Sequence, residues 1–208
     1  MKENILFDID YVIINTHLLK DNYRKIISEL VKVSVGDVCD REKEYVKKDS
    51  NFTDFSPEEY IDFIAKSYDV STQSVSNAFF SENNFKDICY SEVENVLNDL
   101  NKDYCLGIFS EGLKDFQMLK LHKSGLLKYF NNETTFIFRR KLTQESLNLI
   151  PRNSFIIDDN KFVIEALVQT KLFRPIWLNR KTKEKLEDCR TIFNLSEARD
   201  VIENYSAK

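Results

Sequence analysis

Hydrophobic and polar positions divide the chain into short apolar runs and longer stretches with helical spacing. The first apolar run, residues 4–14, is rich in isoleucine and valine, which is typical of a buried strand. From Thr16 the apolar positions recur every three or four residues, which predicts a helix. The more polar stretch 36–55 predicts short helices and loops.

Capping residues mark further helix starts in the first half of the chain. Ser56, Pro57 and Glu59 supply an N-cap, a first-turn proline and a capping-box glutamate, so a helix is predicted to begin there. Another helix is expected near residues 71–81. Ser91 shows the same capping signature as Ser56.

After residue 102 apolar runs alternate with helical stretches, which predicts a parallel sheet with helices on both faces. The helical stretch 15–89 interrupts this alternation after the first strand and therefore indicates an insertion. We expect an α/β fold, a Rossmannoid parallel sheet flanked by helices with an inserted helical cap: residues 1–14 and 90–208 form the core domain, and 15–89 the cap domain. The later strand candidates are 104–109, 134–138, 154–157, 174–178 and 191–195.

Composition narrows the class of protein. The 208 residues carry a formal net charge of -4 with mixed signs and no basic block, so a nucleic-acid partner is not expected. The sequence contains no run of about 18 apolar residues, so no membrane span is expected. The four cysteines, at positions 39, 89, 105 and 189, have no CxxC spacing and indicate free thiols in a reducing compartment. These features predict a soluble cytoplasmic protein.

Polar side chains follow four of the apolar strands. Asp8 and Asp10 stand inside the first apolar run, where a carboxylate is costly unless it is paired, hydrogen-bonded or bound to a metal. Ligands of open α/β sheets bind outside the carboxyl ends of the strands, so these side chains are expected to gather on one rim. Acidic pairs there can hold Mg²⁺, which prefers oxygen ligands. The groups that follow the other three strands are Ser110, the cluster Arg139, Arg140 and Lys141, and the pair Asp158 and Asp159.

Four segments in order, "DIDYV", "FSEG", Lys141 and "IIDDN", resemble the four motifs of the haloacid dehalogenase-like (HAD) hydrolase superfamily. The resemblance covers nearly the whole chain, and the predicted helical insertion stands where the C1-type cap of that superfamily is found. Tyr11 stands where many members have glycine. Other departures from the common pattern are Val12, Glu111, Leu142 and Val163.

The resemblance implies a role for each catalytic candidate. Asp8 would be the nucleophile that forms an aspartyl-phosphate, and Asp10 the general acid and then the base that activates water. Lys141 would offset the negative charge of the nucleophile and the phosphate, with Arg140 as the competing candidate for that cation. Dehalogenases of the superfamily lack a carboxylate at the position of Asp10, so the resemblance implies phosphate hydrolysis.

The same resemblance implies ligands for Mg²⁺ and for the phosphoryl group. The metal would be held by Asp8, the main-chain carbonyl of Asp10 and Asp159, with Asp158 assisting. Substrate phosphoryl oxygens would be bound by Ser110 and the backbone that follows it, Glu111 and Gly112.

The predicted activity is Mg²⁺-dependent hydrolysis of a small phosphorylated metabolite, because a cap over the site would exclude macromolecules. Two alternatives remain open. A phosphotransferase or phosphomutase would use the same residues with a second hydroxyl as acceptor, and a binding protein on this fold would be non-catalytic. The substrate, the cap residues that select it and the oligomeric state are left open by the sequence.

Overall fold

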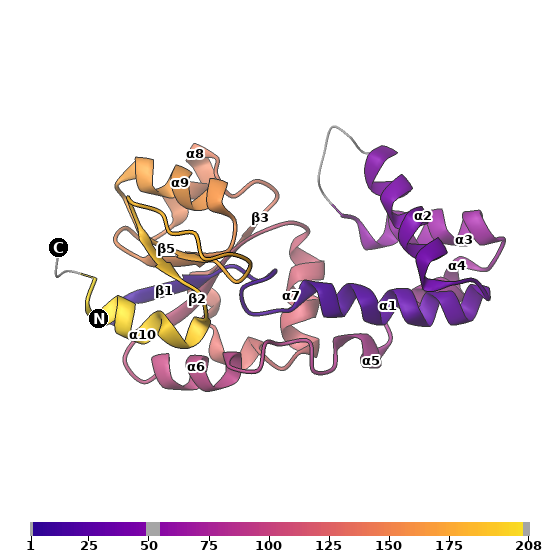
Figure 1. Cartoon of the computed structure of the whole chain (residues 1–208), viewed down its shortest axis with the longest axis horizontal. Helices are drawn as coiled ribbons and strands as arrows, with labels where there is room; N and C mark the ends of the chain where they lie inside the picture. Colours follow the sequence, from indigo (N-terminus) through magenta and orange to yellow (C-terminus); the bar gives the residue numbers. More distant parts are fainter. Residues whose placement is uncertain (1, 49–54, 206–208) are drawn as a thin grey trace.

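The structure is a computed structural model that describes residues 2–48 and 55–205. Figure 1 shows a sheet flanked by helices and, beside it, a group of helices that begins with α1 (Thr16–Val31). The sheet has six strands in the order β3-β2-β1-β4-β5-β6, and every pair is parallel. This confirms the predicted α/β fold. The strands are β1 (Asn4–Phe7), β2 (Cys105–Glu111), β3 (Thr135–Phe138), β4 (Phe155–Asp158), β5 (Arg174–Leu178) and β6 (Arg190–Ile192).

The central strand β1 sends alternate side chains into two hydrophobic clusters, as strand geometry requires. Ile5 and Phe7 pack in the larger cluster, to which α6, α7 and α10 contribute. Leu6 points to the other face and packs with residues of α8 and α9. Helices therefore cover both faces of the sheet (Figure 1). They are α6 (Val93–Leu100), α7 (Lys114–Lys123), α8 (Gln144–Leu149), α9 (Lys161–Thr170) and α10 (Ala198–Glu203), with short 3-10 turns η1 (Leu127–Tyr129), η2 (Asn132–Thr134) and η3 (Leu195–Glu197).

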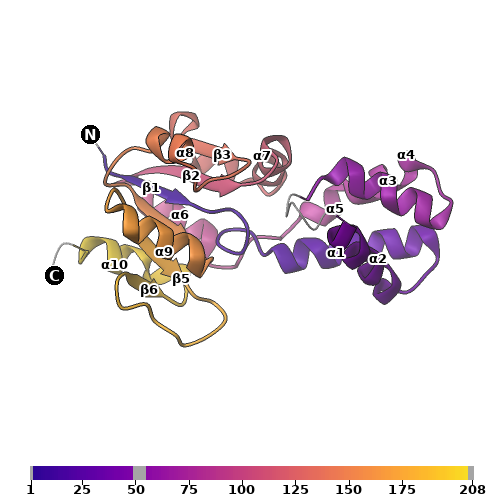
Figure 2. The same cartoon turned by 90° about the horizontal axis from the view of Figure 1, so that it is seen from above.

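Among the described residues between β1 and α6, five helices form a separate group beyond one end of the sheet, here called the cap (Figure 2). Aromatic rings fill its interior: the ring of Tyr23 lies 5.9 Å from that of Tyr60 and 4.8 Å from that of Phe79. The domain limits at 14/15 and 89/90 stay a prediction. The cap helices are α1 (Thr16–Val31), α2 (Val35–Lys48), α3 (Pro57–Tyr68), α4 (Thr72–Phe79) and α5 (Glu82–Phe85).

Local signals predicted some helix starts and not others. Ser56 caps α3 as expected, and its side chain accepts a hydrogen bond from the backbone N–H of Glu59. The capping assignment at Ser91 is wrong: α6 begins at Val93, after Glu92, without a side-chain capping bond. The stretch 36–55 was expected to hold short helices and loops, but α2 is one helix of 14 residues. Residues 49–54 of that stretch lie outside the described residues.

The two chain crossings between sheet and cap lie against each other. Ile14 forms an antiparallel bridge with Cys89, and the backbone N–H of Asn15 donates to the carbonyl of Ile88 over 2.7 Å. Arg180, after β5, donates to the carbonyl of Val12 over 3.0 Å. The cap is thus joined to the core by two paired segments. Among the described helices, none combines the length and the apolar character needed to cross a membrane.

Candidate active site

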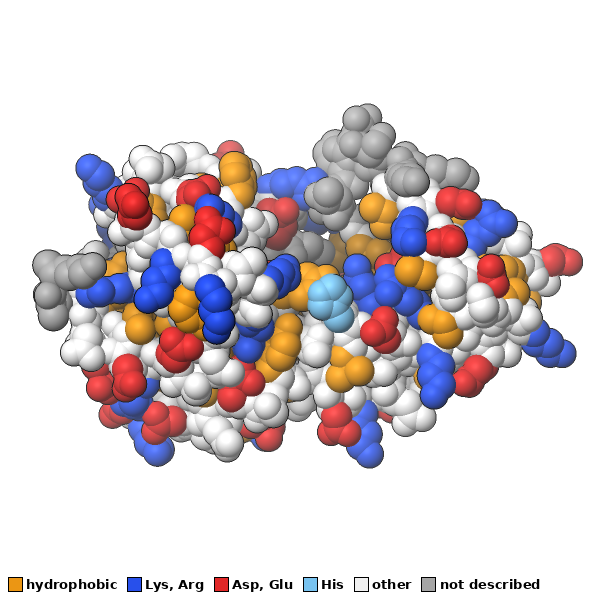
Figure 3. All heavy atoms as spheres, in the orientation of Figure 1, with side chains coloured by type: hydrophobic (Ala, Val, Ile, Leu, Met, Phe, Trp, Pro, Cys, Tyr) orange, Lys and Arg blue, Asp and Glu red, His pale blue; other side chains and the backbone are white. Residues whose placement is uncertain are grey.

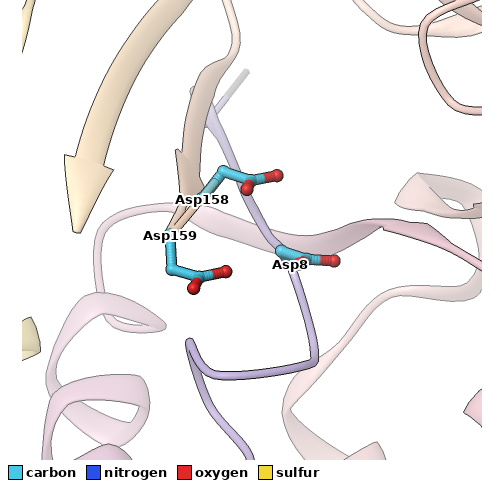
Figure 4. Close-up of side chains that lie close together, drawn as sticks. All are labelled: Asp8, Asp158 and Asp159. Carbon is cyan, nitrogen blue, oxygen red and sulfur yellow. The ribbon is translucent and has the colours of Figure 1, made fainter. Parts of the chain in front are cut away.

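Three carboxylates meet where β1 and β4 end. Asp8 directly follows β1, and its backbone N–H donates to the carbonyl of Ile157 over 2.9 Å, which fixes it beside β4. Asp158 ends β4 and Asp159 follows it. One oxygen from each of the three side chains lies within 4.8 Å of the others, and Figure 4 shows the three side chains close together. The neighbouring strands therefore bring together three of the four predicted metal-binding residues.

Lys141 is the cation that reaches this group. Its Nζ lies 2.5 Å from Asp158 Oδ2 and 3.4 Å from Asp8 Oδ1, and the residue is only 4% exposed. Its own backbone N–H donates to Glu111 Oε2 over 2.9 Å, which ties the loop after β3 to the end of β2. The competing candidate, Arg140, is more exposed and lies 3.8 Å from Glu111 Oε1. These contacts favour Lys141 over Arg140.

Burial and crowding raise the pKa of the acidic groups. Burial raises the pKa of Asp8 to about 6, although Lys141 opposes this and the neighbouring Asp158 adds to it. The pKa of Asp159 is also raised, first by burial and then by the charge of Asp8. Burial lowers the pKa of Lys141, but the charges of Asp8 and Asp158 outweigh this and raise it overall. The site therefore holds more negative charge than one lysine compensates.

Asp10 stands apart from the three carboxylates. Lys120 Nζ lies 2.7 Å from both of its carboxylate oxygens, Gln117 Nε2 donates to Oδ2 over 3.0 Å, and the hydroxyl of Thr16 donates to Oδ1 over 2.6 Å. Burial alone would raise the pKa of Asp10, but the charge of Lys120 and the hydrogen bonds from Lys120, Thr16 and Gln117 together outweigh it and lower the pKa to about 2. The side chain of Asp10 is thus held as an anion by two residues of α7 and the first residue of the cap. The predicted role of its main-chain carbonyl in metal binding stays a prediction.

Sequence reasoning missed Lys120, Gln117 and Thr16. Lys120 is 2% exposed and Gln117 5%, which is unusual for a lysine on an amphipathic helix. The two are three residues apart and therefore lie on the same face of α7. The sequence offers only a lysine and a glutamine three residues apart in a predicted helix, and this pattern does not identify Asp10 as their partner.

The predicted phosphate-binding segment lies at the end of β2. Ser110 is inside the strand, and its hydroxyl is buried and makes no hydrogen bond among the described residues. Glu111 lines a cavity of about 210 Å³ together with Asp8, Asp10, Lys141 and others. Gly112 has a φ of 133°, and a Cβ there would lie 3.1 Å from Gln117 Nε2, so this turn requires glycine. The three predicted residues thus end at the rim of the carboxylate site.

Tyr11 forms the turn between Asp8 and the cap in a left-handed conformation, with a φ of 62°. Its backbone N–H donates to the carbonyl of Ile14 over 2.9 Å, which closes the turn. The ring lies 5.0 Å from that of His17, and Lys181 Nζ lies 5.1 Å from the centre of the Tyr11 ring. A bulky residue with positive φ is uncommon. Tyr11 therefore places an aromatic ring at the position in "DIDYV" where many members of the superfamily that the sequence resembles have glycine.

No family model and no curated protein matches the sequence. Solved structures do match over nearly their whole length. The HAD-hydrolase YfnB of Bacillus subtilis, bound to magnesium, has a TM-score of 0.68 at 15% identity, covering 97% of this chain and 98% of that one. A 2-haloacid dehalogenase of Pseudomonas syringae has a TM-score of 0.66 at 16% identity, covering 99% and 100%. A HAD phosphatase of Thermococcus onnurineus has a TM-score of 0.59 at 21% identity, covering 97% and 98%. At these identities the likeness shows a shared fold.

Proposed function

We propose that this chain, which has the fold of the HAD-like hydrolases, is a Mg²⁺-dependent phosphatase that acts on a small phosphorylated metabolite. The observation that carries the proposal is the arrangement around Asp8: a buried carboxylate with raised pKa, a buried lysine 3.4 Å away and two further carboxylates. Solved structures of this fold include both phosphatases and dehalogenases. The carboxylate of Asp10 supports the phosphatase reaction, because it can move a proton to and from oxygen.

In the first step a carboxylate oxygen of Asp8 attacks phosphorus, and the bond from phosphorus to the leaving oxygen breaks. The leaving oxygen takes a proton that Asp10 delivers. In the second step Asp10 removes a proton from water, the water oxygen attacks phosphorus, and the Asp8–phosphorus bond breaks to release phosphate. Lys141 offsets negative charge on Asp8 and on the phosphoryl oxygens in both steps.

The salt bridge with Lys120 makes the two roles of Asp10 unequal. An ionised Asp10 is the form that accepts a proton from water, so the contacts from Lys120 and Gln117 favour the second step. Proton delivery in the first step is opposed by the same contacts, because they lower the pKa of Asp10. Esters whose leaving group needs no proton are therefore expected to be the best substrates.

The carboxylate group fits a hard divalent cation. Asp8, Asp158 and Asp159 offer three oxygens within 4.8 Å of one another. Burial raises the pKa of Asp8 and Asp159, and the negative charge of neighbouring carboxylates adds to this. Mg²⁺ takes such oxygen ligands and, when bound, supplies positive charge against the phosphate. Asp8, Asp158 and Asp159 would hold it, while Lys141 already neutralises one charge of the group.

The testing experiment is a phosphate-release screen over metabolite phosphates and p-nitrophenyl phosphate, with Mg²⁺ and with a chelator. We expect Mg²⁺-dependent release, together with a phosphoryl adduct on Asp8 detectable by intact mass. Transfer to an added alcohol without phosphate release would identify a phosphotransferase. If neither release nor adduct is found with any phosphate ester, while halide is released from a 2-haloacid, the phosphatase proposal is wrong.

A further inference from the structure

Asp159 lines two cavities of the core. One, of about 210 Å³, is the cavity that Asp8 and Lys141 also line. The other has about 310 Å³, and Tyr11 and Lys181 are among its lining residues. Lys181 is not one of the described residues that line the first cavity, so it reaches Asp159 from the side of the second.

Lys181 is a second cation beside the three carboxylates. Its Nζ lies 3.6 Å from Asp159 Oδ2. Lys141 Nζ contacts the other two carboxylates, at 3.4 Å from Asp8 and 2.5 Å from Asp158. Two lysines therefore face the three carboxylates that would hold a divalent cation. Lys181 already balances part of the charge that such a cation would balance at Asp159.

The segment after β5 fixes the backbone of Lys181 at this place. Its N–H donates to Asn179 Oδ1 over 3.2 Å, and the N–H of Thr182 donates to the same oxygen over 3.0 Å. Asn179 is only 5% exposed, so this turn is anchored in the core. The backbone of Asp159 is held by β5 as well, because Trp177 Nε1 donates to its carbonyl over 3.0 Å. The contact between Lys181 and Asp159 is thus built on two fixed backbones.

The ammonium group of Lys181 can leave Asp159 without a change of the backbone. The Lys181 side chain is 67% exposed, whereas that of Asp159 is 14% exposed. Lys181 Nζ also lies 5.1 Å from the centre of the Tyr11 ring, within the range of a cation–π interaction. Tyr11 therefore offers the ammonium group a second partner, and water offers a third.

We propose that Lys181 is a counter-cation of the metal site, which partly neutralises Asp159 when no metal is bound and which thereby lowers the affinity of the site for Mg²⁺. A cation among the carboxylates repels the ammonium group and competes with it for the charge of Asp159. Binding of Mg²⁺ is therefore expected to weaken the contact between Lys181 and Asp159. The inference rests on the proposed Mg²⁺-dependent function and adds a residue that tunes its metal affinity.

The test measures the dissociation constant of Mg²⁺ by titration calorimetry for the wild type and for Lys181→Met, at low ionic strength and mildly alkaline pH. Lys181→Met should bind Mg²⁺ about threefold to fivefold more tightly, which is the range expected for a largely exposed ion pair. In about 1 M KCl, where the Debye length is about 3 Å, the two constants should agree within about twofold. The rise in melting temperature caused by Mg²⁺ should be larger in Lys181→Met than in the wild type.

Lys183→Met is the matched control for the loss of one positive charge. Figure 3 shows Lys and Arg side chains (blue) on the core up to its junction with the cap, so an effect of the general surface charge has to be separated from that of Lys181. Lys183 is an exposed lysine two residues away, and its Nζ lies over the ring of Phe193 at 5.4 Å from the centre. Lys183→Met and the charge-conserving Lys181→Arg should both keep the Mg²⁺ affinity of the wild type.

Three results would overturn the inference: equal Mg²⁺ affinity in the wild type and Lys181→Met at low salt, weaker binding in Lys181→Met, or the same gain in Lys183→Met. If Mg²⁺ binds the wild type and phosphate is released, such a result leaves the proposed function intact. Failure of the proposed function looks different, because then no phosphate ester is hydrolysed whatever the affinities are. Absence of Mg²⁺ binding in the wild type and in all three variants would overturn the inference and the Mg²⁺ dependence together.

Discussion

Lys120 and Asp10 form a salt bridge between residues 110 positions apart in the sequence, with Nζ 2.7 Å from each carboxylate oxygen. It joins α7 to the turn that follows β1. Lys120 is only 2% exposed, so the cation of the pair is buried, and both residues line a cavity of about 280 Å³. The residue that moves protons in the proposed reaction is therefore held in place by the core, with Thr16 of the cap as a further contact.

Removal of Lys120 should destabilise the fold. Lys120→Met leaves a largely buried carboxylate without its cation, and breaking a buried pair costs about 3 kcal/mol. Urea unfolding at neutral pH measures the change. Lys114→Met, on an exposed position of the same helix, should be within about 0.5 kcal/mol of wild type. If Asp10→Asn combined with Lys120→Met does not recover part of the loss, the bridge is not the cause.

The stability of the metal-free protein should fall as pH rises from about 4 to about 6. The pKa of Asp8 is raised from its ordinary 3.8 to about 6 in the folded state, so the folded protein binds the proton more tightly than the unfolded chain in this window. Asp8→Asn removes the contribution of Asp8 to this dependence and should be more stable than wild type at pH 7 by up to about 3 kcal/mol. Thermal unfolding in chelator measures both curves.

The two curves for wild type and Asp8→Asn should meet below about pH 4, where the wild-type carboxyl is protonated in both states. Asp21→Asn, at a side chain that is 70% exposed, is the control and should follow wild type. A parallel offset at all pH values would show that Asp8 does not titrate as described.

Mg²⁺ should raise the melting temperature, because it binds the folded carboxylate group and not the unfolded chain. Asp159→Asn should weaken this response strongly, since it removes one of the three converging oxygens. Asp62→Asn, on an exposed position of α3, should respond as wild type does. An unchanged response in Asp159→Asn would remove Asp159 from the ligand set.

Asp8 and Asp10 should have separable kinetic roles. Asp8→Asn should abolish turnover, because the bond to phosphorus is made by that carboxylate. Asp10→Asn should slow hydrolysis by about a hundredfold to ten-thousandfold, with a smaller loss for p-nitrophenyl phosphate, whose leaving group needs no proton. Steady-state kinetics and intact mass check both. Accumulation of a phosphoryl adduct in Asp10→Asn is the expected signature, and an equal loss with all leaving groups would count against proton transfer by Asp10.

Much of the sheet could be predicted because its strands are short apolar runs followed by polar residues. The run at β1 and the acidic pair at the end of β4 were found this way, and with them the rim on which Asp8 and Asp158 meet. The parallel direction of the strands follows from their alternation with helices, whereas the strand order was not predicted. These signals are local in the sequence, so one chain is enough to detect them.

The contacts that tune the site could not be predicted. Lys120 reaches from α7 to Asp10 in the turn after β1, and nothing in the residues around either one indicates the other. Lys141 could be separated from Arg140 only by burial, since adjacent residues have the same sequence context. The Ser91 signature failed because Glu92 has a helical backbone and leaves no N-cap geometry at Ser91.

Because Ile14 and Cys89 pair with each other, the cap is an insertion whose two ends lie side by side. Departure and return lie side by side, because Asn15 bonds directly to Ile88. The five helices can therefore lengthen, shorten or be exchanged without moving the strands that carry Asp8 and Asp158. Evolution can thus vary the cap, and with it substrate selection, while the carboxylates at the ends of the strands are inherited unchanged.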